Sequence, residues 1–567
     1  MKAEVTPRAL PEGVKRIGWF AVFTAVFAVL AAFVFWGTWS TNFAPVMPDS
    51  AIVYPPHWLW DCWCAFLETG RISPPDLFKL GSPYFWQELQ YAISLYAAGL
   101  ALAYFLRGRG LSRPAALGAG LLLAFCGYWS SLFSAGHLGW FFMSAQALWA
   151  FGLTDRLVCR GQLRHALMLG AVEGWACCWQ ADIWPLFALL AFIYFAYACV
   201  RERRFPWKGV IAAAAAFMLV GGAGVRTAFV NDLASRESQL EGASEDGRGK
   251  AGSAGKPKAA GTEESPSEAE EQRWIFVTNW SLPGDEVAEF FNARLNGDTS
   301  CPYVLSIGAQ RGSGVRPYTG AIGRQFGAPQ GNYRQQSVYV GWVTCLLALA
   351  GLLAGLFRRR RADGDWLARD ARFFALLAVV FAVFSLGRYC EPVYRVVFHL
   401  PFFGLMRCPV KWHHLTEFCL CALAGFGIQA LVDLCRLLPK KAGRIALVAL
   451  GAVVLLGAFD LARIDRLYCA PVDISEARRQ NGSFNFAFLR RGDFAQPQVA
   501  AMVRQRRIVP VANPSPDMYL VGVVSPWGPR RPLPPFGTAA VLGVLSALSS
   551  LGIVAFALGG WRRRKRT

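Results

Sequence analysis

Charged residues are scarce in this chain: they make up 17% of its 567 residues, against about 25% in ordinary soluble domains. Hydrophobic residues account for 54% and aromatic residues for 14%, and the mean hydropathy is +0.32. This composition excludes a soluble protein, a secreted disulfide scaffold and a disordered chain for most of the length. The sequence therefore predicts a polytopic α-helical membrane protein.

The common signatures of nucleotide and hydrolase chemistry are also missing. The sequence has no P-loop followed by Ser or Thr, no Ser-centred elbow and no dinucleotide fingerprint after a strand. An ATP-driven pump and a soluble hydrolase therefore have no support. Zinc is not expected, because Cys62 and Cys64 form only a CxC pattern with no second pair at metal spacing.

Apolar runs of about 20 residues, enough to cross about 30 Å of hydrocarbon, predict about twelve transmembrane helices. They cover the ranges 17–40, 86–106, 115–134, 139–154, 166–181, 183–200, 209–229, 337–357, 373–388, 415–435, 445–462 and 536–560. The first run is long and lacks a small-residue cleavage site, so we expect a retained signal anchor rather than a cleaved signal peptide.

The positive charges support this arrangement. With the N-terminus inside and the helices alternating, seven inside segments hold 29 of the 58 Lys and Arg residues, whereas the short outer turns SAGH and WQAD hold none. This agrees with the positive-inside rule. We therefore predict a multi-pass protein of the bacterial cytoplasmic (inner) membrane with both termini cytoplasmic. The net charge of +21 needs no nucleic acid, since anionic lipids suffice as partners of the basic tail.

The same alternation divides the chain. The predicted parts are a cytoplasmic N-terminus (1–16), an N-terminal membrane module (17–229) with an outer loop (41–85), a second outer loop (230–336), a C-terminal membrane module (337–462) with an outer loop (389–414), a small mixed outer domain of strand and loop (463–535), and a last helix with a basic tail (536–567). Residues 241–272 are polar and lack aromatic residues, so we predict a disordered insertion. The stretch 273–336 is aromatic and polar, and we expect one wall of a site.

An acid just outside the first helix is the first candidate for chemistry. Asp49 stands in an apolar, Pro-rich neighbourhood at the expected headgroup level, where its carboxylate could serve as general base for an acceptor hydroxyl. The alternative is a capping or turn residue, because Pro-Asp-Ser also suits a helix start. Further acids in the same loop could bind an acceptor or act as a second acid: Asp61, Glu68, Asp76 and Glu88.

A second constellation lies in LPFFGLMRCPVKWHHLTEF, residues 400–418. Arg407, Lys411, His413 and His414 fall within eight residues on the predicted outer side. Cations there oppose the topology rule, and Arg and Lys are good donors to phosphate. We expect them to bind the phosphate of a lipid-linked donor; nonspecific anchoring to headgroups is the alternative. Metal ligation by the paired histidines is disfavoured, because they lack the HxxxH or HExxH spacing.

Three isolated polar residues complete the candidates. His137 and Asp182 sit at short outer turns, where most polar residues are simply hydrogen-bonded. Glu173 falls inside a predicted helix and should face the bundle interior rather than lipid.

The chain resembles the GT-C superfamily of membrane glycosyltransferases and, within it, the bacterial YfhO-type membrane proteins. The resemblance covers roughly residues 17–460 and rests on the early MPDS loop, on AFCGYWSSLFSAGHLGWFFMSAQALWAFGLTDR, on FSLGRY followed by VYRVVFHLPFFGLMRCPVKW, and on the order of helices. It implies a GT-C-like fold and transfer of a sugar from a polyprenyl-phosphate donor to a cell-envelope, lipid or protein acceptor on the extracytoplasmic face.

On this resemblance, Asp49 matches the early acid expected to act as base, and Arg407 falls in an Arg-x-Pro stretch before a late helix. The long insertion and the short tail domain depart from the family pattern. No cofactor is expected; a divalent metal is compatible with the reaction but not required, because polyprenyl phosphate is already a good leaving group. The competing classes are a transporter or lipid flippase, which also commonly has twelve helices, and a non-catalytic scaffold for envelope assembly.

Overall fold

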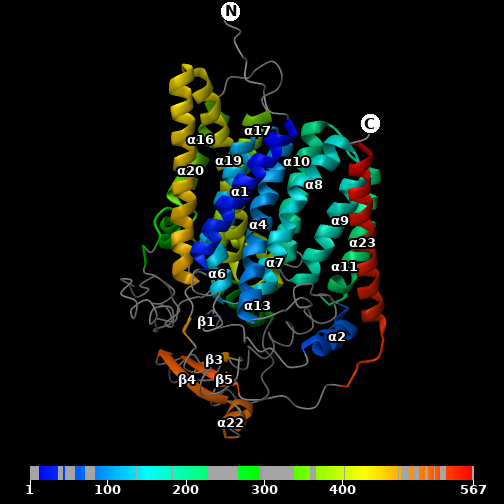
Figure 1. Ribbon diagram of the computed structural model, residues 1–567. Helices are drawn as coiled ribbons and strands as arrows, with labels where there is room; N and C mark the ends of the chain where they lie inside the picture. The colour runs from blue at the N-terminus through cyan, green and yellow to red at the C-terminus, as the bar shows by residue number, and fades with distance from the viewer. Residues whose placement is uncertain are drawn as a thin grey trace, which may run out of the picture.

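The computed structural model has a helical bundle with a small sheet below one end (Figure 1). It describes residues 12–35, 43–44, 58–70, 83–135, 137–180, 183–227, 266–293, 295–296, 338–357, 366–400, 403–469, 472–473, 486–490, 497–504, 508–515, 518–523 and 532–564. The bundle helices are α1 (Glu12–Val34), α4 (Pro83–Gly108), α5 (Arg113–Ala124), α6 (Gly127–Ala135), α7 (Leu138–Ala147), α8 (Trp149–Arg160), α9 (Leu163–Trp179), α10 (Trp184–Glu202), α11 (Trp207–Thr227), α16 (Trp342–Phe357), α17 (Trp366–Ser385), α19 (His413–Leu437), α20 (Lys440–Tyr468) and α23 (Thr538–Arg564).

The described residues of each of the twelve predicted apolar ranges are mostly helical, but the count of spans is lower than predicted. Among the described residues, seven helices are long and apolar enough to cross a membrane, or up to eight if a bent pair counts as one. Two further apolar helices, Gly18–Val34 and Trp342–Phe357, are shorter. The expected twelve spans are therefore corrected to seven or eight by length and composition.

Helix breaks explain much of this difference. The predicted span 139–154 is two helices, α7 and α8, which meet at Leu148. The run at 373–388 belongs to α17, which bends by 112° into the segment Gly387–His399. Gly387 has φ +50, a left-handed backbone that cannot continue an α-helix and that Gly adopts without strain.

Small residues allow the closest helix contacts. A Cβ at Gly170 on α9 would collide with the Ala213 carbonyl of α11, and one at Gly427 on α19 would collide with the Leu347 carbonyl of α16. These two helix pairs are among the most extensive contacts in the bundle. In lipid the hydrophobic effect does not drive helices together, so close van der Waals packing of one backbone against another stabilises their association instead. Glu173 on α9 faces a neighbouring helix, as expected, and accepts a 2.6 Å hydrogen bond from Trp184 Nε1.

Shorter elements gather at one end of the bundle. They are the helices α2 (Trp58–Thr69), α13 (Pro266–Val277), α18 (Glu391–His399) and α22 (Pro497–Arg504), and the 3₁₀ turns η2 (Gly284–Phe290), η4 (Gly387–Cys390), η5 (Phe403–Leu405) and η6 (Pro409–Trp412). The first turns of α13 belong to the segment 241–272 that we predicted to be disordered; residues 241–265 lie outside the described ones.

Local sequence features explain why α13 begins at Pro266, inside the segment predicted to be disordered. A proline opens it and acidic residues fill its first turns, and both favour a helix N-terminus. Glu271 also lies 3.3 Å from Arg395 of α18, whose guanidinium lies 4.1 Å from the Trp274 ring.

Two small sheets involve the segment after α20. Strands β3 (Phe486–Arg490), β5 (Met518–Val523) and β4 (Ile508–Ser515) form an antiparallel sheet in that order. They lie in the segment 463–535, where we expected mostly strand and loop. Strand β1 (Phe43–Ala44) pairs antiparallel with β2 (Val472–Asp473). This pair ties the start of the 41–85 loop to the chain just beyond α20.

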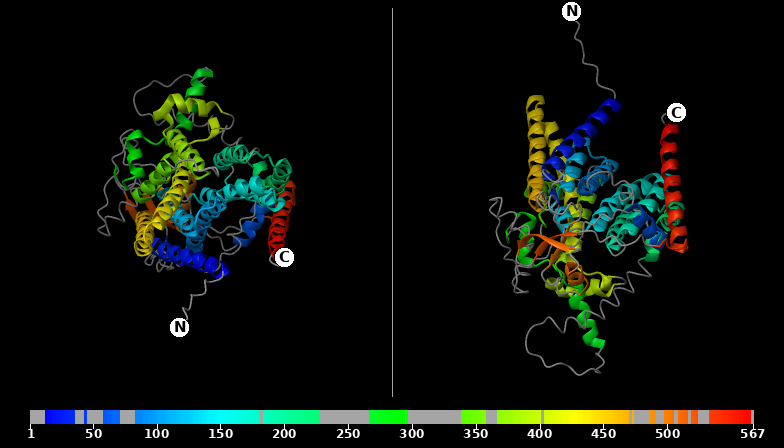
Figure 2. Two further views of the ribbon diagram at one scale, coloured as in Figure 1. Left: turned by 90° about the horizontal axis from the view of Figure 1, so that it is seen from above. Right: turned by 60° about the horizontal axis from the view of Figure 1, so that its bottom comes forward.

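The start of α1 and the end of α23 lie toward the same end of the bundle (Figures 1 and 2). Both views of Figure 2 place α23 at the periphery, where it contacts α11, α9 and α2. The position of the termini relative to a membrane, and the identity of that membrane, stay predictions.

Candidate functional site

The predicted acids of the 41–85 loop are only partly described. Asp49 and Asp76, like Asp182, lie outside the described residues. Asp61 and Glu88 belong to α2 and α4, but their side chains are not described. Glu68 is exposed on α2. His137 precedes α7 as its N-cap residue, and its ring centroid lies 5.9 Å from that of Trp140.

The stretch 403–412 is held against the end of α13. The backbone amide of Cys408 donates to the Val277 carbonyl at 3.1 Å, and that of Val410 donates to the Trp280 carbonyl at 3.3 Å. Cys408 has φ +74, a left-handed turn that is costly for a residue with a side chain. Arg407 is half-buried, with its guanidinium carbon 5.4 Å from the Phe276 ring. The described residues of the predicted wall at 273–336 thus contact the stretch 403–412, which we call the basic stretch because it holds Arg407 and Lys411.

His413 and His414 turn into the protein core and meet a glutamate that sequence reasoning missed. His414 Nδ1 lies 3.3 Å from Glu417 Oε2, and His413 Nε2 lies 3.6 Å from Glu417 Oε1. The Tyr128 amide of α6 donates to Glu417 Oε1 at 3.1 Å. We call these three side chains, His413, His414 and Glu417, the His–Glu cluster. Their i, i+3 and i, i+4 spacing on the first turns of α19 is the signal that could have found it.

Aromatic rings enclose the His–Glu cluster. The His414 ring contacts those of Trp129, Trp140 and Phe187, with centroids 4.5, 6.4 and 5.6 Å away, and the His413 ring lies 4.3 Å from that of Phe290. All three members are fully or almost fully buried. Lys411 is buried too, with its ammonium 5.4 Å from the Trp140 ring. Burial of this kind differs from nonspecific anchoring at headgroups, where the cations remain at the surface.

A second buried acid faces the cluster from α20. Asp465 is 3% exposed and lies within hydrogen-bond reach of the Ser130 hydroxyl on α6. Its carboxylate and that of Glu417 are close enough to interact electrostatically. One turn further on, α20 ends, and β2 then pairs with β1. The basic stretch, the His–Glu cluster and the start of the Asp49 loop therefore lie at one end of the bundle.

The described residues contain no group of three or more His, Cys, Asp or Glu side chains arranged to hold a metal ion. The two histidines present different nitrogens to opposite oxygens of one carboxylate. This geometry suits sharing of protons better than convergence on a cation.

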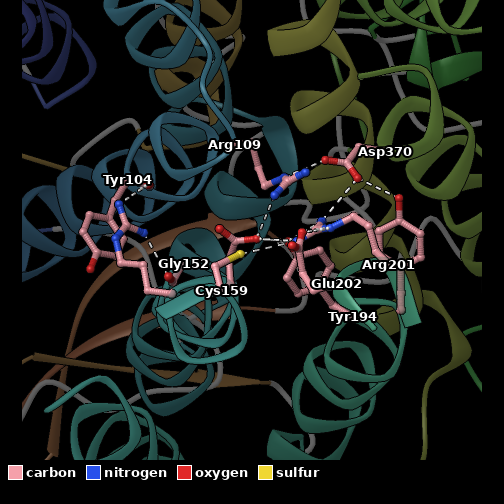
Figure 3. A network of polar contacts seen from close by, with 11 residues as sticks. Tyr104, Arg109, Gly152, Cys159, Tyr194, Arg201, Glu202 and Asp370 are labelled. Carbon is pink, nitrogen blue, oxygen red and sulfur yellow. Dashed lines mark hydrogen bonds and ion pairs between the residues drawn. The ribbon is translucent and has the colours of Figure 1, made fainter. Parts of the chain in front are cut away.

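A polar network at the opposite end of the bundle joins four helical elements (Figure 3). Arg109, just after α4, donates to Asp370 of α17 at 2.7 Å and to Asp155 of α8 at 3.2 Å. Arg201 of α10 donates to Asp155 at 2.8 Å and to Asp370 at 3.3 Å. Tyr194 completes the network through a 2.8 Å hydrogen bond to Asp155. We call these residues the arginine–aspartate network.

The arginine–aspartate network is balanced in charge. Its arginine and aspartate side chains are at most 7% exposed. Burial lowers the pKa of the Arg109 guanidinium, but Asp370, Tyr194 and Asp155 together more than offset this and raise the pKa above its ordinary value. Two cations face two anions, so we interpret the network as a joint between the N-terminal module and α17 rather than as a binding site. The sequence feature that could have revealed the network is an aspartate, Asp155 or Asp370, inside each of two arginine-rich segments. We used these segments only to count positive charges.

Comparisons with known proteins add little. No family model matches the sequence, and no curated protein matches it. Among solved structures, the fold is distantly similar to ArnT from Cupriavidus metallidurans bound to undecaprenyl phosphate, at 12% identity. The match covers 90% of this chain and 99% of that chain, with a TM-score of 0.27. Likeness at that TM-score is too loose to carry an argument about fold or activity.

Proposed function

We propose that this chain is a membrane glycosyltransferase that moves a sugar from a polyprenyl-phosphate-linked donor to a cell-envelope, lipid or protein acceptor. The proposal keeps the GT-C assignment suggested by the sequence resemblance. Its main structural support is the β1–β2 pair, which draws the start of the Asp49 loop to the end of the bundle where Arg407 lies. Asp49 follows Ala44 by five residues, a reach of at most about 18 Å.

In this proposal the reaction is a single displacement. Asp49 takes the proton of the acceptor hydroxyl as its oxygen attacks the anomeric carbon. The bond from that carbon to the phosphate oxygen breaks, its electron pair leaves with the polyprenyl phosphate, and the anomeric configuration inverts. Arg407 is the basic residue of the stretch best suited to hold the leaving phosphate, because it is half-buried whereas Lys411, His413 and His414 are buried.

The test is transfer of radiolabelled sugar in proteoliposomes that contain the full chain, polyprenyl-phosphate-linked hexose or pentose, and cell-envelope lipid or polymer fractions. Asp49→Asn should lower the turnover rate about 100-fold or more, since a general base contributes about that much. Glu391→Gln, which changes an exposed acid on α18 paired with Arg395, is the matched control and should leave the rate unchanged. Full transfer by Asp49→Asn would remove the central step.

Arg407 is tested separately by binding. Arg407→Ala should weaken binding of polyprenyl phosphate about tenfold or more, because a charge-assisted hydrogen bond is lost. Arg407→Lys should restore only part of the affinity, since Lys lacks the planar fork. Movement of the intact donor across the bilayer with no cleavage of the sugar–phosphate bond would instead favour a lipid flippase.

A further inference from the structure

Glu417 is a buried carboxyl group that takes no part in the proposed transfer reaction, and its charge has no evident counter-ion among the described residues. A carboxylate inside a membrane-embedded bundle is expensive unless it is neutralised. Glu417 and His413 are 0% exposed and His414 is 4% exposed. The Tyr128 amide that donates to Glu417 is a neutral donor and does not balance its charge.

The contact between His414 and Glu417 requires a hydrogen. His414 Nδ1 and Glu417 Oε2 lie 3.3 Å apart, so one of the two atoms must carry a hydrogen. Three states satisfy this: a neutral imidazole with its hydrogen on Nδ1 donates to the carboxylate, a protonated imidazole donates to the carboxylate, or a carboxylic acid donates to a neutral imidazole. The first state leaves the buried carboxylate negative, whereas the other two hold one more proton and are electrically neutral, which burial favours. Loss of one proton leaves a neutral imidazole beside a buried negative charge.

The remaining ring nitrogens of the cluster lack hydrogen-bond partners. His414 Nε2 and both ring nitrogens of His413 have none among the described residues. Each lies among aromatic rings, which can stabilise one imidazolium but provide no second counter-ion. His413 Nε2 lies 3.6 Å from the other carboxylate oxygen, beyond hydrogen-bond distance, so it would accept the proton only after moving closer.

Charged and titratable groups on the neighbouring elements are few. Asp465 faces Glu417 from α20, with an Oδ1 atom that has no hydrogen-bond partner among the described groups. Cys126, between α5 and α6, lies close to both acids, its Sγ 3.5 Å from that of Cys421. Lys411 is a buried cation above the Trp140 ring, which also contacts the His414 ring. Two buried carboxyl groups close enough to interact cannot both ionise cheaply, which again favours a bound proton.

We propose that the His–Glu cluster is a proton-binding site in the membrane-embedded core, in which Glu417, His414 and His413 share one exchangeable proton and Asp465 is a second station for it. When the proton moves, the O–H bond of Glu417 breaks as the N–H bond of His414 forms, with no change in total charge. The site is independent of the proposed glycosyl transfer and would operate equally in a transporter.

The experiment uses the histidines themselves, since the chain has six. The full chain, labelled with ¹⁵N in histidine and reconstituted in lipid, is titrated by nuclear magnetic resonance. We expect the His413 and His414 resonances to shift together over one pH interval. Glu417→Gln should abolish that joint shift, since the neutral amide has no proton to share. Asp433→Asn, which changes a half-buried acid further along the same helix, should leave it intact.

The wild-type chain alone can overturn the proposal. His399, whose side chain is 61% exposed, serves as the internal reference. If His413 and His414 keep one tautomer and one shift between roughly pH 4 and 9, which brackets the ordinary pKa values of carboxyl and imidazole groups, and the pH-difference infrared spectrum shows no buried protonated carboxyl, the site binds no exchangeable proton. That measurement remains decisive even if Glu417→Gln does not fold.

Discussion

Asp370→Asn gives the sharpest test of the arginine–aspartate network. The Asp370 carboxylate accepts from Arg109 at 2.7 Å and from Arg201 at 3.3 Å, and its side chain is 0% exposed. Asparagine keeps the size of the side chain but removes its charge, so two buried guanidinium groups are left to share Asp155. Breaking a buried ion pair in this way costs about 3–5 kcal/mol. The hydrogen bond from Tyr197, at 2.6 Å, can survive because the amide oxygen still accepts it.

The assay is the free energy of unfolding of the full chain in mixed micelles, measured by titration with a denaturing detergent and followed by tryptophan fluorescence. Asp433→Asn is the matched control. Its partner Arg436 lies 3.3 Å away on the same helix, with side chains 59% and 39% exposed, and such surface pairs contribute about 0.5 kcal/mol or less. Asp433 also accepts a 2.8 Å hydrogen bond from Gln429 Nε2, which an amide oxygen can still accept. Both variants make the same chemical change, so their difference reports mainly the loss of a buried rather than a surface charge.

A difference of less than about 1 kcal/mol between Asp370→Asn and Asp433→Asn would refute the reasoning, because the network would then be solvated rather than buried. A double-mutant cycle with Arg109→Met adds a check. If the pair is coupled through a direct contact, the second change should recover part of the loss caused by the first.

Three further outcomes are expected from the same stability measurement. Gly170→Ala should destabilise the chain strongly, since its Cβ would meet the α11 backbone, whereas Gly552→Ala, which has open space around it, should be neutral or slightly stabilising. Ser550→Ala should cost about 1 kcal/mol or less by removing the 2.7 Å hydrogen bond from Trp175 Nε1 that links α23 to α9; no loss at all would mean that this link contributes nothing. Burial raises the pKa of the Glu289 carboxyl above 4.5, so the folded chain binds this proton more tightly than the unfolded chain, and stability should fall as pH rises from the unfolded pKa to the folded one. Glu289→Gln should therefore be more stable than wild type at neutral pH but not at low pH; equal stability at both would contradict the burial.

The pattern of helices was readable because apolar run length and positive charge are local properties of the chain. The described residues of every predicted apolar range are mostly helical, and Glu173 faces a neighbouring helix as the cost of a buried acid requires. The number of spans was not readable in the same way. The break at Leu148 and the left-handed turn at Gly387 lie inside or beside apolar runs, so hydropathy alone does not reveal them.

The candidate residues show the same division. The stretch at 407–414 was identified because its cations oppose the topology rule, but phosphate binding remains a prediction for all four residues. Glu417 was missed because it is a single acid in an apolar helix. Its two histidine partners are recognised only when residues three and four positions apart on the helix are compared. Asp465 escaped for a different reason, since it lies about 50 residues away and on another helix.

By itself, the sequence determined that this chain is a helical membrane protein, where its helices lie, and which residues are too costly to bury alone, because hydrophobicity and charge act residue by residue. Only the tertiary structure decided which of those residues meet. It placed Glu417 between two histidines and opposite Asp465, and it balanced Arg109 and Arg201 against Asp155 and Asp370 across two modules. Such pairings depend on how distant helices pack, and the energy of a buried charge depends on the partner that packing supplies.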